Sequence, residues 1–124
     1  MNETKNALII SDKLQDINKL RRYFDSSFTI KAAHAATGAA DLAASSNFVC
    51  IVYHIGADYG DLFPFYKELR WRTETSETPL VVIADANVLK PLGEYTSLIN
   101  TKILPPSATR EIFMAELSDL MGLL

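Results

Sequence analysis

The chain is short of cysteine and of net charge, and both shortages narrow its possible functions. One cysteine in 124 residues cannot form an internal disulfide, so we expect a cytoplasmic protein. Cys50 lies inside an apolar run and is predicted to be a buried, unreactive thiol. A formal net charge of −3 provides no long-range attraction to nucleic acid or to an anionic membrane. We therefore expect neither as a direct partner.

Long apolar runs and catalytic motifs are also absent. No run approaches the roughly 20 apolar residues that span a bilayer. The first residues, MNETKNALIISDK, lack the basic and apolar regions of a signal peptide. The sequence has no G-x-G-x-x-G motif, no Ser/His/Asp order, no Cys/His pair and no metal-ligand spacing. We therefore expect no enzymatic activity, no cofactor and no metal.

What the chain does contain is a series of short apolar runs separated by amphipathic segments. Such runs predict strands that are covered on both faces. Alternation with helices predicts one parallel sheet, because parallel strands need helical crossovers. The length suits one domain, which we place at residues 1–124. The predicted strands are residues 7–11, 28–33, 48–54, 79–84 and 101–104, and the alternating pattern of 28–33 places that strand nearer an edge.

The segments between these runs predict helices with an apolar stripe. We expect Asp12 to cap the first helix, Asp61 the third and Ser107 the last. The second helix is short and alanine-rich (TGAADLAASS), and the fourth is limited to about residues 94–99 by Pro91 and Gly93. The predicted inward stripes are Leu14, Ile17, Leu20 and Phe24; then Leu62, Phe65, Tyr66 and Leu69; and finally Phe113, Leu117, Leu120 and Leu124.

Three local sequences lead to a family resemblance. They are IISD after the first strand, PLVVIADA at the fourth and ILPPS at the fifth. With the element order, they make the chain from Ala7 to Leu124 resemble a receiver domain of bacterial two-component signalling, in a degenerate (pseudo-receiver) form. The resemblance implies a flavodoxin-like (βα)₅ fold, a doubly wound α/β sheet of five parallel strands in the order 2-1-3-4-5.

The residues that carry receiver chemistry are mostly replaced. Receivers hold Mg²⁺ on two acidic residues after the first strand; these positions fall on Ser11 and Asp12. Their phosphoacceptor aspartate falls on Tyr53 or His54. The position of the switch hydroxyl is Ala84, and that of the lysine before Pro105 is Leu104. Only Asp12 keeps the family residue, so we predict that ordinary aspartyl phosphorylation cannot occur.

Each remaining polar candidate at this site has a plainer interpretation. Asp12 is a possible metal ligand, with Asp58 or Asp61 folding back towards it, but a helix cap explains it better. A role for His54 as phosphoacceptor, metal ligand or pH sensor needs a partner, and none is visible in the sequence. We therefore expect His54 to be simply hydrogen-bonded, and Tyr53 to fill the space of the phosphoryl group.

Two surfaces are candidates for protein contacts. Phe63 and Trp71 lie off the apolar stripe of the third helix and are expected to be exposed. The resemblance implies a second surface, formed by the fourth helix, fifth strand and fifth helix, which receivers use for dimers and outputs. Its candidate residues are Tyr95, Leu98, Met114 and Met121.

These observations favour a phosphorylation-independent pseudo-receiver, a signalling module that binds a partner protein or a covalently linked output domain, with a homodimer as another option. One alternative is a small-ligand or cofactor binder with the same fold. SDKLQD follows the first strand, where a flavodoxin has a Ser/Thr-rich phosphate loop. Another alternative is a receiver with a residual metal or phosphate response through Asp12 and a loop carboxylate.

Overall fold

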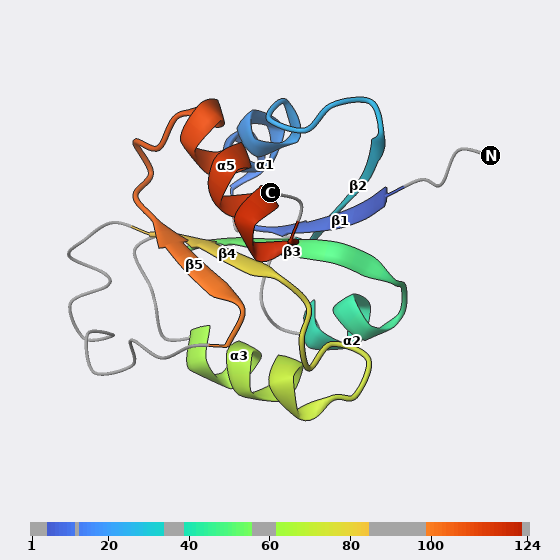
Figure 1. Cartoon of the computed structure of the whole chain (residues 1–124). Helices are drawn as coiled ribbons and strands as arrows, with labels where there is room; N and C mark the ends of the chain where they lie inside the picture. The colour runs from blue at the N-terminus through green and yellow to red at the C-terminus, as the bar shows by residue number, and fades with distance from the viewer. Residues whose placement is uncertain (1–4, 12, 34–38, 56–61, 85–98, 123–124) are drawn as a thin grey trace.

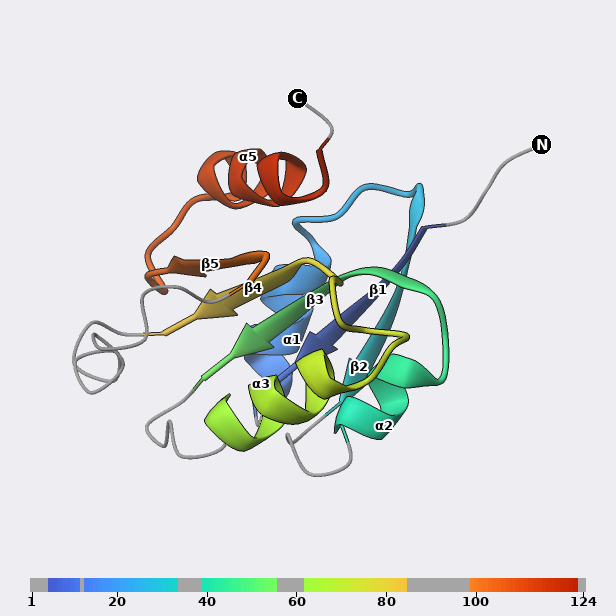
Figure 2. The ribbon, with the colours of Figure 1, turned by 60° about the horizontal axis from the view of Figure 1, so that its bottom comes forward.

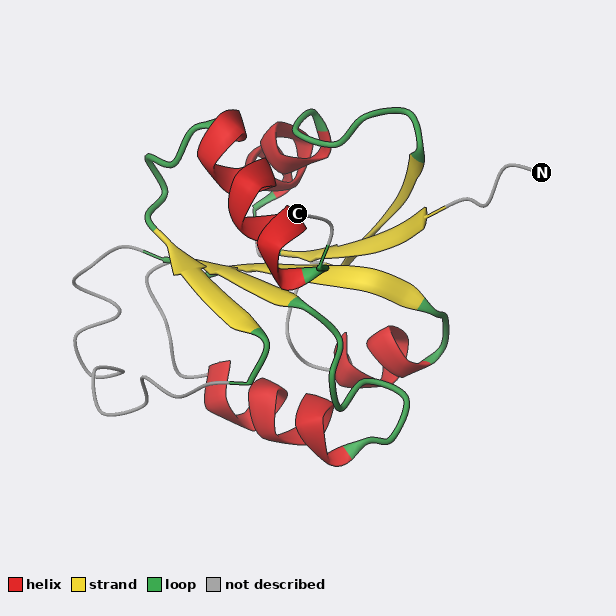
Figure 3. Cartoon of the chain, viewed as in Figure 1, coloured by secondary structure: helices red, strands yellow, loops and turns green. Residues whose placement is uncertain are grey.

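Strands and helices alternate up to the fourth strand of the computed structural model, which describes residues 5–11, 13–33, 39–55, 62–84 and 99–122 (Figures 1 and 3). The strands are β1 (Lys5–Ile10), β2 (Phe28–Ala33), β3 (Phe48–His54), β4 (Leu80–Ile83) and β5 (Thr101–Leu104). The helices are α1 (Leu14–Arg21), α2 (Ala39–Ala44), α3 (Leu62–Trp71) and α5 (Arg110–Leu120). The helix predicted at residues 94–99 lies outside the described residues, apart from Ile99.

The strands form one parallel five-stranded sheet in the order β2-β1-β3-β4-β5. This confirms the predicted fold class and the edge position of β2. In β4 every residue is buried, and so are the last four residues of β1. A strand covered on both faces has to be apolar at successive positions. One register shift interrupts the β1–β3 pairing, where Asn6 pairs with Phe48 but Ala7 pairs with Cys50.

Two helical layers cover the sheet, with α1 and α5 on one face and α2 and α3 on the other (Figures 1 and 2). The α1/α5 layer buries Ile17, Leu20, Phe113 and Leu117 against the sheet. The α2/α3 layer uses small residues in α2 and larger ones in α3: Ala39, Ala40, Ala43, Phe65 and Leu69. The alanines let the short helix α2 approach the sheet closely.

The predicted helix starts are partly wrong. The N-cap of α1 is Lys13 rather than Asp12, and Leu14 is 60% exposed instead of belonging to the inward stripe. The cap of α5 is Thr109, whose side chain accepts a hydrogen bond from the backbone N–H of Ile112, rather than Ser107. Ser107 and Thr109 are both good capping residues, so composition alone does not select one of them.

Two side chains of α3 fasten the backbone that enters β5. The Tyr66 hydroxyl accepts a hydrogen bond from the N–H of Ile99 at 2.7 Å. The Arg70 guanidinium donates to the carbonyl oxygens of Ile99 and Thr75, each at 2.8 Å. Burial lowers the pKa of Arg70, and the hydrogen bond with Tyr66 opposes this shift. These hydrogen bonds of Tyr66 and Arg70, which we call the clamp, thus join the α2/α3 layer to the segment that leads into β5.

We expect the Arg70→Met substitution to lower the free energy of unfolding by about 2 kcal/mol, because it leaves the carbonyl oxygens of Thr75 and Ile99 without their charged donor. Urea denaturation measures the loss. The matched control is Arg72→Met, which removes exposed ion pairs with Asp41 and Glu68 and should cost less. Equal losses in the two variants would contradict the role of the clamp.

Cys50 has no accessible surface, and burial raises the pKa of its thiol to about 12. The thiolate is the reactive form, so almost none is present at neutral pH. We expect the folded protein to be inert to a thiol reagent such as dithionitrobenzoate at pH 8, and the urea-unfolded chain to react fully. Rapid labelling of the folded protein would show that β3 opens readily.

Candidate functional site

The carboxyl ends of β1, β3, β4 and β5 lie side by side. We call this end of the sheet the carboxyl edge, and it is where open α/β folds bind ligands. In the strand register, Ile10 of β1 pairs with Tyr53 of β3. His54 pairs with Ile83 of β4, which in turn pairs with Leu104 of β5. The sequence-predicted positions Ser11, Tyr53, His54, Ala84, Leu104 and Pro105 therefore all lie along this edge. Asp12 lies outside the described residues.

Tyr53 points from the sheet into the α2/α3 layer. Its side chain is buried, and its ring packs edge-on against Phe65 with 5.2 Å between the ring centroids. Ile55 and Ala84 belong to the same apolar cluster. The aromatic ring is thus part of the apolar core of the α2/α3 layer.

Leu104, which ends β5, and Ala84, which follows β4, are apolar residues at the β4–β5 side of the carboxyl edge. Leu104 is 7% exposed and belongs to the core of the α1/α5 layer together with Phe113. The backbone N–H of Ala84 donates to the carbonyl oxygen of Leu104 at 3.0 Å. These two side chains offer neither a cation nor a hydroxyl to an anionic ligand.

Ser11, at the end of β1, is used by the backbone around it. The side chain is buried, and its hydroxyl oxygen accepts a hydrogen bond from the N–H of Lys13 at 3.2 Å. The backbone N–H of Ser11 donates to Ala33 of β2 at 3.0 Å. Ser11 therefore shapes the turn from β1 into α1.

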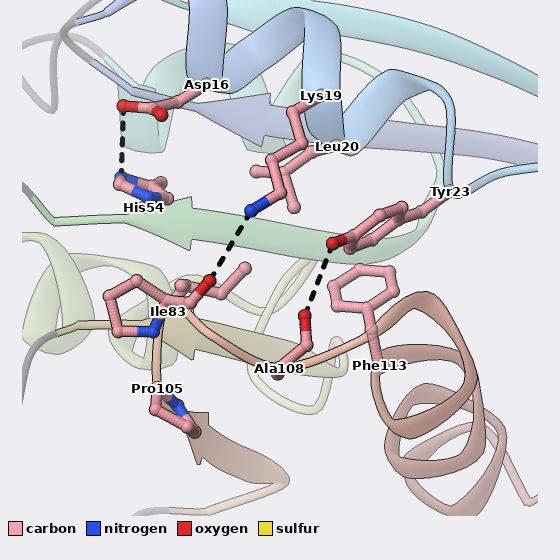
Figure 4. A pocket seen from close by; sticks show the side chains of 10 residues that line it. Asp16, Lys19, Leu20, Tyr23, His54, Ile83, Pro105, Ala108 and Phe113 are labelled. Carbon is pink, nitrogen blue, oxygen red and sulfur yellow. Dashed lines mark hydrogen bonds and ion pairs between the residues drawn. The ribbon is translucent and has the colours of Figure 1, made fainter.

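His54 points into the opposite layer from Tyr53 and meets Asp16 of α1 (Figure 4). The distance from His54 Nδ1 to Asp16 Oδ2 is 3.7 Å, and Nδ1 is buried without a hydrogen-bond partner. Both residues line a pocket of about 20 Å³, room for one water molecule, which Lys19, Tyr23 and Pro106 also line. The pocket thus brings an imidazole and a carboxylate together in a mostly apolar lining.

Sequence patterns did not identify Asp16 as a candidate, so no partner was predicted for His54. Two features of the sequence could have predicted this pair. His54 and Tyr53 are neighbours in a strand and so face opposite sides of the sheet, and Asp16 lies in the first turn of α1. The expected ordinary hydrogen bond of His54 is also missing at Nδ1. Among the described residues, no group of three or more His, Cys, Asp or Glu side chains is placed to hold a metal ion.

The candidate contact residues differ in exposure. Trp71, at the end of α3, is 90% exposed, as predicted. Met114 and Met121 are partly buried against the core of the α1/α5 layer. Tyr95, Leu98 and the side chain of Phe63 lie outside the described residues. Within the described part of the chain, no helix has both the length and the apolar character needed to cross a membrane.

Comparison with solved structures identifies the fold. A sensor protein from Polaromonas sp. JS666 matches with a TM-score of 0.81 and 16% identity, over 98% of each chain. The receiver domain of a sensor histidine kinase from Pseudomonas aeruginosa PAO1, whose active site cleft coordinates magnesium, matches with a TM-score of 0.81 and 15% identity, over 97% of this chain and 99% of that one. A chemotaxis response regulator of Vibrio cholerae matches at 0.76 and 16%, over 95% and 99%.

No protein-family model and no curated protein matches the sequence. At such low identities the structural likeness establishes the fold alone, which is that of CheY-like response-regulator receiver domains, with the strand order 2-1-3-4-5.

Introducing a lysine at position 104 tests how tightly the carboxyl edge is packed. We expect Leu104→Lys to lower the free energy of unfolding by about 3 kcal/mol, because the ammonium would be buried beside Phe113 without a partner. Thermal and urea denaturation measure the change. Leu104→Met, which keeps the volume, should cost less than about 1.5 kcal/mol. If Leu104→Lys were as stable as the parent, the edge would have room for a charged side chain.

Proposed function

We propose that this chain is a phosphorylation-independent pseudo-receiver: one domain, residues 1–124, that works as a signalling module by binding a protein. The observation that carries the proposal is the burial of Tyr53, Ala84 and Leu104 at the carboxyl ends of their strands. The resemblance puts a receiver's acceptor at Tyr53 or His54, its hydroxyl at Ala84 and its lysine at Leu104. The proposal includes a cytoplasmic location and no enzymatic activity of the domain itself.

The chemistry of phosphoryl transfer supports this proposal. An aspartyl phosphate needs a carboxylate nucleophile, and cations have to neutralise the phosphoryl oxygens. No carboxylate stands at positions 52–55, which are Val52, Tyr53, His54 and Ile55. Leu104 replaces the cation with a buried apolar side chain. Lys102, on the same strand, is engaged by Glu116 and Asp119 of α5, at 3.5 and 3.3 Å.

The partner in this proposal is a protein chain, either separate or covalently linked as an output domain. An exposed tryptophan supports a contact at the end of α3, because large aromatic side chains are enriched in interfaces and costly in water. Trp71 is 90% exposed and has the partly buried Arg72 as its neighbour. A homodimer through β5 and α5 is the other arrangement that we propose, with Met114 and Met121 at that surface.

A titration with Mg²⁺ and beryllofluoride, which mimics an aspartyl phosphate, tests the proposal. We expect the amide resonances of Tyr53, His54, Ala84 and Leu104 to stay unchanged, because no carboxylate stands at positions 52–55 to hold the beryllium. The measurement is a series of ¹H–¹⁵N correlation spectra, with Mg²⁺ alone and fluoride alone as controls.

Saturable shifts that require both Mg²⁺ and beryllofluoride would overturn the phosphorylation-independent assignment. They would favour a residual response through Asp12 and a loop carboxylate. The Asp12→Asn variant would then lose the response.

A further inference from the structure

The contact between His54 and Asp16 is incomplete as the protein stands. At 3.7 Å, His54 Nδ1 and Asp16 Oδ2 are too far apart for a hydrogen bond. The side chain of His54 is only 16% exposed and that of Asp16 25%, and Nδ1 has no partner. A charged imidazole–carboxylate pair settles at about 2.7–2.9 Å, so closing the gap requires a shift of about 1 Å.

The groups around His54 leave Asp16 as its natural counter-charge. Of the described residues lining the pocket, α1 contributes Asp16 and Lys19 as titratable groups, and Tyr23 comes from the turn that follows α1. Lys19 is exposed, and its ammonium donates to the carbonyl oxygen of Pro106 at 3.5 Å. The residues from β4, from α5 and from the segment between β5 and α5 are Ile83, Pro105, Pro106, Ala108 and Phe113, and none of them ionises.

We propose that His54 and Asp16 form a proton-operated latch between β3 and α1. When His54 is neutral, the pair stays open as described above. When His54 takes up a proton, Nδ1–H becomes a cationic donor facing a carboxylate, and α1 is drawn towards the carboxyl end of β3. Imidazole is the side chain that ordinarily changes charge between pH 5 and 8, while carboxyl groups ordinarily stay ionised down to about pH 4.

Hydrogen bonds carry a movement of α1 to the segment that precedes α5 (Figure 4). The Tyr23 hydroxyl donates to the carbonyl oxygen of Ala108 at 3.2 Å. In return, Arg110 Nε donates to the carbonyl oxygen of Tyr23 at 3.0 Å. Closure of the latch would thus shift the start of α5 along with α1. This gives the domain an input that does not involve phosphate, and it rests on the pocket alone, whatever the outcome for aspartyl phosphorylation.

A pH titration by NMR of the full chain tests the latch. The ring resonance of His54, identified by its loss in His54→Gln, is followed from pH 8.5 to pH 4.5 together with the backbone amides. We expect the amides of Ile17, Leu20 and Ala108 to shift with the same midpoint as the His54 ring. In Asp16→Asn, the ring should still titrate, but the shifts of Ile17 and Leu20 that share its midpoint should disappear.

Two further variants separate the latch from general effects of pH. Asp41→Asn removes a carboxylate from the other helical layer and should leave the coupled shifts intact. Tyr23→Phe removes the donor to Ala108, so Ile17 and Leu20 should still respond while the response of Ala108 shrinks. The proposal would be overturned if the amide shifts of α1 did not share the midpoint of the His54 ring resonance. It would also be overturned if they shared it equally well in Asp16→Asn.

Discussion

The burial of β1, β3 and β4 between two helical layers is the constraint on which the rest of the molecule depends. Because both faces of these strands are covered, their residues are apolar along most of their length. Parallel pairing then places all the strand ends at one edge, whatever residues occupy them. The position of the site thus comes from the sheet, and its chemistry comes from the few residues that end each strand.

The sheet was predictable because its signals are local and repeated. Continuous apolar runs such as that of β4 identify buried strands, and the alternation of β2 identifies an edge. Helix starts were less predictable. Asp12 and Ser107 are good capping residues by composition, yet the helices begin after Lys13 and Thr109. Packing against the sheet sets the start of a helix, so a preference worth about 1 kcal/mol can be overruled.

At the candidate site, the sequence predicted which residues end each strand but not how their side chains meet. The positions of Tyr53 and Leu104 near the carboxyl ends of β3 and β5 follow from the predicted strands. The approach of His54 to Asp16 depends on how α1 lies over β3, and 38 positions separate the two residues along the chain. The same is true of Arg70, whose acceptors at Ile99 and Thr75 lie beyond its own helix.

The register shift at the start of β3 adds one residue to the strand without changing the side on which the later residues lie. Val49 is the extra residue in that pairing, so Val49 and Cys50 both lie on the α1/α5 side. After this irregularity, the strict alternation of a strand places Tyr53 on one side and His54 on the other. Because Val49 and Cys50 lie on the same side, removal of either one would leave Tyr53 and His54 facing their present layers. The bulge can therefore absorb a one-residue change in length at the far end of β3 without changing which side chain faces each layer at the candidate site.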